Sequence, residues 1–213
     1  MKHARSGKNT SDLLAIAMSG LLAAACATAP TMEGPKIPPA GATWTNAQTL
    51  AGSFGSGNKV VTTTMGEGTW QGKTMRAFHS GANWTFINSD FCWVGMAAGG
   101  KPIFTWDPPI CYRYPIAVGK TWSEKRRLMI HPAKRTIALE SSWKVEAYEE
   151  VSVPAGTFGA FRISYSDNNG TDRVDWYSPD LGVFVKSNVK RSAKHPSGPG
   201  SVESMLVSQT ITK

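Results

Sequence analysis

The chain is poor in acidic residues, cysteine and histidine, and these shortages exclude several kinds of site. Its 213 residues include 15 aspartates and glutamates against 23 lysines and arginines, with three cysteines and four histidines. Zinc sites need Cys-x-x-Cys pairs or histidine partners at spacings that this sequence lacks. The formal net charge is +8. Because the basic residues are scattered in clusters of two or three, this surplus favours anionic surfaces and does not indicate nucleic-acid binding.

The sequence also lacks an apolar run long enough for a stable membrane span, and after residue 43 it lacks an amphipathic helical pattern. The apolar run at residues 13–25 (LLAIAMSGLLAAA) is shorter than the roughly 20 residues that a transmembrane helix needs. It follows a basic start at residues 2–8 and ends in small residues, which is typical of a secretory signal. We therefore interpret residues 1–25 as a signal peptide.

Residues 22–26 (LAAAC) resemble the lipobox of bacterial lipoproteins, in which small residues precede a cysteine that is acylated and becomes the new N-terminus. The usual pattern has leucine three places before the cysteine, where this chain has Ala23. The resemblance implies lipidation of Cys26. With Ala27 in place of an aspartate, it also implies an outer-membrane lipoprotein that faces the periplasm. The alternative is ordinary cleavage after Ala29, which would give a soluble periplasmic protein.

A proline-rich stretch at residues 28–42 (TAPTMEGPKIPPAGA) follows the cysteine and offers little that can be buried. Proline restricts its own φ and pushes the preceding residue towards extended conformations. We therefore expect residues 26–42 to be a lipid-anchored, semi-extended tether. The remaining residues, 43–213, are enough for one domain with its own core. They contain no second linker, so we expect a single β domain.

Lipidation of one cysteine would leave Cys92 and Cys111 as a pair. Disulfides persist in oxidising compartments, so we expect these two residues to be bonded. A bond that closes a loop of about 20 residues stabilises a fold by about 3 kcal/mol in the chain-entropy model. Two buried free thiols are the alternative.

Apolar and polar residues alternate with period two through much of the domain, which is typical of strands with one buried face. The clearest example runs from residue 137 to 145, and Glu149 on its apolar side predicts a bulge or a strand end. Residues 161–165 repeat the pattern before Asp-Asn-Asn-Gly at 167–170, which predicts a tight hairpin turn. Further strands are expected at residues 59–65, 74–79, 83–87, 91–96, 174–176, 183–188 and 202–212. The predicted fold class is all-β, a curved antiparallel sheet arranged as a meander, sandwich or open barrel.

Three segments together resemble a group of uncharacterised bacterial envelope proteins. They are residues 114–122 (YPIAVGKTW), 151–158 (VSVPAGTF) and 176–186 (WYSPDLGVFVK). The resemblance covers about half of the domain. It implies an antiparallel sheet curled into an open half-barrel, similar to the lipoprotein carriers LolA and LolB. These motifs are turns and core aromatics, so they carry information about fold, and fold analogy alone does not establish lipid carriage.

The chain has eight tryptophans, a high number for its length. Aromatic residues at alternating positions can line the concave face of a half-barrel and hold an apolar ligand. The candidates are Trp84, Phe86, Trp143, Phe161 and Trp176. Filling of an ordinary core is the alternative interpretation of the same residues.

No group of residues in the sequence indicates catalysis or a cofactor. A nucleophile needs a base within hydrogen-bond reach, but His79 and Ser80 are neighbours on a predicted strand and point apart. We therefore expect a non-enzymatic envelope lipoprotein that binds an apolar or amphipathic ligand, or a protein partner. The alternatives are a scaffold protein that contacts anionic envelope polymers and a hydrolase whose site is assembled from residues distant in sequence.

Overall fold

The computed structural model of the protein describes Met1 and residues 29–211. The expected signal peptide at residues 1–25 and the expected lipidation of Cys26 therefore lie outside the described residues, apart from Met1. Within the described part, no helix has the length and apolar character needed to cross a membrane.

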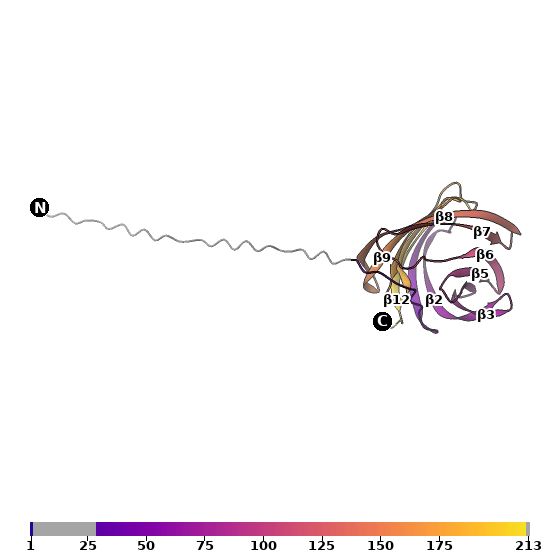
Figure 1. The fold of residues 1–213 in the computed structure, drawn as a ribbon, viewed down its shortest axis with the longest axis horizontal. Coiled ribbons are helices and arrows are strands. Elements are labelled where there is room, and N and C mark those ends of the chain that lie inside the picture. Colours follow the sequence, from indigo (N-terminus) through magenta and orange to yellow (C-terminus); the bar gives the residue numbers. More distant parts are fainter. Residues whose placement is uncertain (2–28, 212–213) are drawn as a thin grey trace.

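The described residues from 43 onward form twelve antiparallel strands in a single closed sheet. The strands are β1 Thr43–Gly52, β2 Gly57–Trp70, β3 Lys73–Ser80, β4 Asn83–Ile87, β5 Trp93–Ala98, β6 Lys101–Ile110, β7 Thr121–Ile130, β8 Arg135–Val153, β9 Gly156–Asp167, β10 Thr171–Ser178, β11 Val183–Arg191 and β12 Gly200–Gln209. Each strand pairs with its neighbours in sequence, and β1 also pairs with β12. Figure 1 shows β12, in yellow, beside the indigo and purple strands that begin the barrel.

The predicted all-β antiparallel fold is confirmed, but the sheet is closed where an open half-barrel was expected. The closing register runs from Trp44↔Gln209 to Gly52↔Gly200. The sequence pattern did not reveal β1, because Asn46 and Gln48 face inward together with Trp44. Two polar residues at inward positions remove the apolar alternation by which a half-buried strand is recognised.

The irregularity predicted from Glu149 is present three residues earlier. The register between β8 and β9 shifts between Val145 and Ala147, so one extra residue changes which side chains face inward. After the shift, Tyr148 packs beside Phe161 with ring centroids 4.9 Å apart. Glu149 keeps 37% of its side chain exposed and accepts a hydrogen bond of 2.7 Å from Trp176 Nε1.

The core consists of three apolar clusters. The first joins Trp44, Met65 and Leu206 to the end of the β8–β9 hairpin, and the second gathers the inward residues of β8–β10 around Trp143. The third lies within β2–β5 and includes Trp70, Ala77, Phe86 and Ala97. Buried residues therefore lie both inside the barrel and between its first strands, β2–β5.

Residues 29–42, part of the expected tether, contain no helix and no named strand, and they pack against the barrel. The backbones of Met32 and Ile116 exchange two hydrogen bonds of 2.9 Å, and both side chains are buried. Lys36 Nζ donates to the backbone oxygen of Asp180. At Gly182, φ is +74° and an added Cβ would lie 2.2 Å from the Lys36 carbonyl oxygen. Only glycine therefore fits where residues 29–42, hereafter the stem, cross the turn between β10 and β11.

Cys92 and Cys111 form a disulfide with their Cα atoms 4.4 Å apart. The bond joins the residue before β5 to the residue after β6, beside the paired residues Trp93 and Ile110. It therefore closes the end of a strand pair whose register shifts twice.

Gly95 on β5 lies under the Trp70 ring, where an added Cβ would be 2.2 Å from Trp70 Cζ2 and 2.9 Å from the Phe104 carbonyl oxygen. We expect Gly95→Ala to lower the free energy of unfolding by about 1–3 kcal/mol through overpacking. Urea denaturation monitored by tryptophan fluorescence measures this change. Gly34→Ala is the matched control, since no atom lies within 4 Å of its added Cβ. Equal stabilities of the two variants would contradict the prediction.

Candidate ligand-binding site

A cavity of about 520 Å³ lies in the lumen of the barrel. Its volume falls within the range of roughly 300–1,000 Å³ that is usual for small-molecule sites. Its wall is formed mainly by inward side chains of β1, β10, β11 and β12, with contributions from β2, β3 and β5. The aromatic members of this wall are Trp44, Phe54, Phe78, Phe91, Trp93, Tyr112, Tyr177 and Phe184.

Aromatic contacts cross the lumen between strands that are not paired. The ring of Phe78 on β3 lies 6.2 Å from that of Trp44 and 6.1 Å from that of Trp93 on β5. Trp93 in turn lies 6.4 Å from Phe184 on β11, at an edge-to-face angle of 81°. Tyr112, from the loop after β6, continues the series to Phe184 and Trp143. Edge-to-face and tilted ring pairs of this kind favour a fixed geometry, so the apolar wall has a defined shape.

The opposite part of the wall is polar. Cross-strand pairing places Gln48 of β1 beside Ser204 of β12, and Ser204 beside Ser187 of β11. Asn46 and Thr63 also line this part of the cavity. An apolar aromatic wall that faces hydroxyl and amide groups suits a ligand with one apolar and one polar portion.

Arg173 on β10 lies where the aromatic and polar parts meet. Its guanidinium carbon is 4.8 Å from the Phe184 ring centroid and 5.5 Å from that of Trp93. Its Nε is 2.6 Å from Asp175 Oδ2, and Asp175 is fully buried. Ser187 Oγ donates a hydrogen bond of 2.6 Å to the other carboxylate oxygen, Oδ1. Burial lowers the pKa of Arg173, whereas the Asp175 carboxylate, Tyr112 and Tyr165 raise it. Together these three raise the pKa by more than burial lowers it, so the net shift is upward and the guanidinium remains charged.

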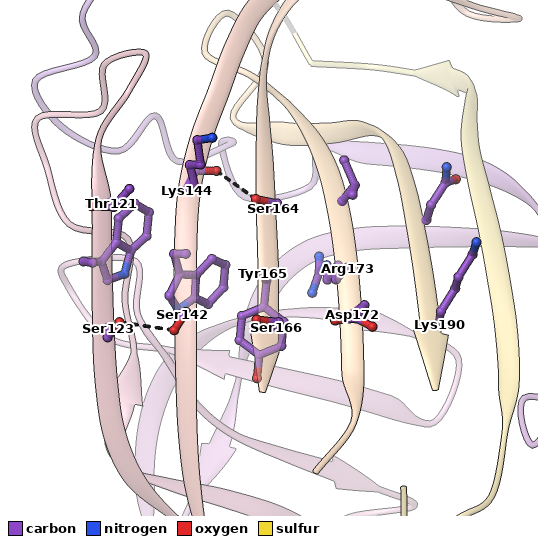
Figure 2. Close-up of a pocket in the computed structure, with 14 residues that line it drawn as sticks. Thr121, Ser123, Ser142, Lys144, Ser164, Tyr165, Ser166, Asp172, Arg173 and Lys190 are labelled. Carbon is purple, nitrogen blue, oxygen red and sulfur yellow. Dashed lines mark hydrogen bonds between the residues drawn. The ribbon is translucent and has the colours of Figure 1, made fainter. Parts of the chain in front are cut away.

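A second hollow, of about 820 Å³, lies on the outer face of β7–β11. Figure 2 shows its small polar residues on neighbouring strands, where Ser123 Oγ lies 3.2 Å from Ser142 Oγ and Ser164 Oγ donates to the Lys144 carbonyl oxygen at 3.5 Å. These contacts leave neither Ser142 nor Ser164 hydrogen-bonded to a base, which an activated nucleophile requires. The hollow is lined both by these polar residues and by Trp122, Trp143 and Tyr165.

The basic cluster at residues 125–127 does not form a free cationic patch. Lys125 pairs with Glu140 at 3.0 Å, and Arg127 pairs with Asp107. Arg126 points into the barrel with 1% of its side chain exposed and pairs with Glu124. The scaffold interpretation therefore gains no support from these residues.

The five aromatic candidates do not meet on one surface, and none of them lines the lumen cavity. Trp143 and Phe161 belong to the second core cluster. Trp84 and Phe86 belong to the third, where the Trp84 ring stacks on His79 with centroids 4.2 Å apart. Trp176 packs beneath Lys186 Nζ, which is 4.7 Å from its ring centroid.

The orientation of β10 explains part of this difference. The alternation Val174–Trp176 indicates one buried face, but Arg173, Asp175 and Tyr177 are the residues that face the lumen. A buried ion pair is unusual in a core, so hydropathy alone assigns such a strand to the wrong face.

No protein-family model matches the chain, and no curated protein matches it in sequence. Solved structures show distant likenesses. A "putative exported protein with YmcC-like fold" from Bacteroides fragilis is 15% identical, with a TM-score of 0.47 over 85% of this chain and 100% of that chain. A "putative lipoprotein" from Parabacteroides distasonis is 12% identical, with a TM-score of 0.41 over 84% and 99%. The hypothetical lipoprotein YmcC from Escherichia coli is 10% identical, with a TM-score of 0.39 over 79% and 85%. These values assign neither a family nor a function to the chain.

Four tyrosines should make the protein less stable in alkali. Burial raises the pKa of Tyr114 to about 12 and also raises the pKa values of Tyr112, Tyr165 and Tyr177 above the usual 10. Above pH 10 the unfolded chain loses these protons while the folded chain keeps them, so the free energy of unfolding falls as pH rises. Tyr177 alone should contribute a loss of about 1.4 kcal/mol at pH 11.

Urea midpoints at pH 9, 10 and 11 measure this effect, and Tyr177→Phe should make the decline shallower. A midpoint that stays constant over this interval would contradict the assigned burial.

Proposed function

We propose that the protein is a non-enzymatic lipoprotein of the bacterial cell envelope that binds an amphipathic molecule in its barrel lumen. The observation that carries the proposal is the cavity of about 520 Å³ with one aromatic and one polar wall. The sequence of residues 1–26, which resembles a lipoprotein signal, supports the location.

The packing of the stem sets how far the barrel would lie from its anchor. Met32 is fixed to Ile116 by two backbone hydrogen bonds, so only the segment from Cys26 to Met32 would separate the barrel from the bilayer. At the extended length of about 3.3–3.6 Å per residue, this segment spans at most about 20 Å. A barrel anchored through Cys26 would therefore stay close to the membrane surface, where amphipathic molecules are concentrated.

Binding in the lumen is tested by a substitution that fills the cavity with a larger side chain. Ser204 lines the cavity, so Ser204→Phe should place a ring in the ligand's space and abolish binding. Native mass spectrometry and organic extraction of protein purified from bacterial membranes measure the bound molecule. Ser142→Phe is the matched control because Ser142 lines the outer hollow, and it should leave the lumen ligand in place.

Thermal unfolding of both variants checks that the barrel still folds. Wild-type protein that carries no co-purified amphiphile and takes up none when it is added would refute lumen binding. Loss of ligand in Ser142→Phe alone would move the site to the outer hollow.

The anchor is tested separately. Cys26→Ser removes the acylated thiol, so the variant should appear in the soluble periplasmic fraction when cells are fractionated, whereas wild type should sediment with membranes. Cys92→Ser, which breaks the disulfide with Cys111 but keeps Cys26, should remain in the membrane fraction. Membrane retention of Cys26→Ser would show that a lipid on this residue is not the anchor.

A further inference from the structure

The guanidinium of Arg173 has one occupied edge and one free edge. Its Nε faces Asp175 at 2.6 Å, and Asp175 is held on its other side by Ser187. Among the residues that the structure describes, none accepts a hydrogen bond from the two Nη atoms. Because the aromatic rings of Trp93 and Phe184 lie against the guanidinium, the group is held in place whether or not its free edge is occupied.

This free edge belongs to a side chain that lines the cavity. Arg173 is one of the lining residues, and 20% of its side chain is exposed. A guanidinium presents parallel N–H groups whose spacing matches the two oxygens of a carboxylate or phosphate. Donors left unpaired in a low-dielectric lumen are costly, so an acceptor from the ligand is favoured there.

The charge of the wall supports an anionic ligand. The charged residues that line the cavity are Arg173 and Lys186, and no acidic residue lines it. Lys186 pairs with Trp176 across β10 and β11, and its Nζ lies 4.7 Å from the Trp176 ring centroid on the other face of the sheet. The guanidinium of Arg173 is therefore the cationic group that faces the lumen. Asp175 lies behind Arg173 and is fully buried, and both of its carboxylate oxygens have partners. A ligand anion would therefore meet the cationic face of the pair and would be shielded from the buried carboxylate.

We propose that the lumen selects amphiphiles with a single anionic head group, carboxylate or phosphate, which accepts two hydrogen bonds from the free edge of Arg173 while the apolar tail lies along Trp44, Phe78 and Trp93. The assignment rests on the proposed lumen binding and adds the class of ligand to it. Arg173 is the residue that distinguishes an anionic amphiphile from a neutral one of the same length.

The experiment compares a fluorescent fatty acid, 11-(dansylamino)undecanoic acid, with its methyl ester. Wild type should bind the acid more tightly than the ester. The variant for this test is Arg173→Gln with Asp175→Asn, because removal of the arginine alone would leave a buried carboxylate unpaired. The double variant should weaken binding of the acid by about tenfold or more, the usual effect of lost charge-assisted hydrogen bonds, and should change binding of the ester by less than about twofold.

Competition of the bound probe by dodecanoate, dodecyl phosphate and dodecanol then separates the head groups. Displacement by either anion at concentrations well below those needed for dodecanol supports the assignment and shows which head group is preferred. Arg173→Lys is the second variant, and it needs no change at Asp175. It keeps the charge but loses the planar fork, so the acid should bind less tightly than to wild type with the ester unchanged.

The outcomes separate this inference from the function on which it rests. Equal binding of acid and ester by wild type, or equal losses of both in the double variant, would overturn the role of Arg173 while lumen binding stands. Failure of wild type to bind either probe would overturn lumen binding itself, and the head-group assignment with it.

Discussion

The backbone hydrogen bonds between β1 and β12 turn a meandering sheet into a barrel, and the lumen exists because of them. Trp44 and Gln48 come from one of these strands and Ser204 from the other. Without the pairing, both strands would be open edges and these side chains would face solvent. Closure also removes unpaired edges that would otherwise be templates for association. The pairing of the first strand with the last therefore both covers the edges of the sheet and forms part of the wall of the candidate site.

Closure creates an interior that the sequence fills partly with polar groups. Arg173 and Asp175 form one inward ion pair, and Glu124 and Arg126 form another. Replacing buried pairs of this kind by apolar residues is often neutral or stabilising, so stability does not account for their presence. Departures from apolar packing are expected where a protein has a function to perform. Both buried ion pairs face the interior of the barrel. The candidate site is therefore placed in the lumen and not in the larger outer hollow.

The same polar groups explain what could be predicted from the sequence. Strands with regular alternation, such as the part of β8 around Leu139 and Trp143, were predicted, and so was the all-β class. β1 was missed because Asn46 and Gln48 face inward, and the closure that depends on β1 was missed with it. On β10 the alternation pointed to Trp176, whereas the buried face carries Arg173. Periodicity of hydropathy identifies faces only where the interior is apolar, so it fails at the residues that line a polar cavity.

The stem and the lumen wall form one packed unit. Tyr177 lines the cavity and donates a hydrogen bond of 3.5 Å to the Lys36 carbonyl oxygen. Gly182 lines the same cavity and lies under the same carbonyl. The stem therefore contacts the cavity wall from outside, and a change in its packing would alter the shape of the lumen. A stem that served only as a flexible spacer would not need a glycine with positive φ beneath it, or a buried methionine paired with Ile116. The segment that leads to the proposed anchor thus also helps to shape the candidate site.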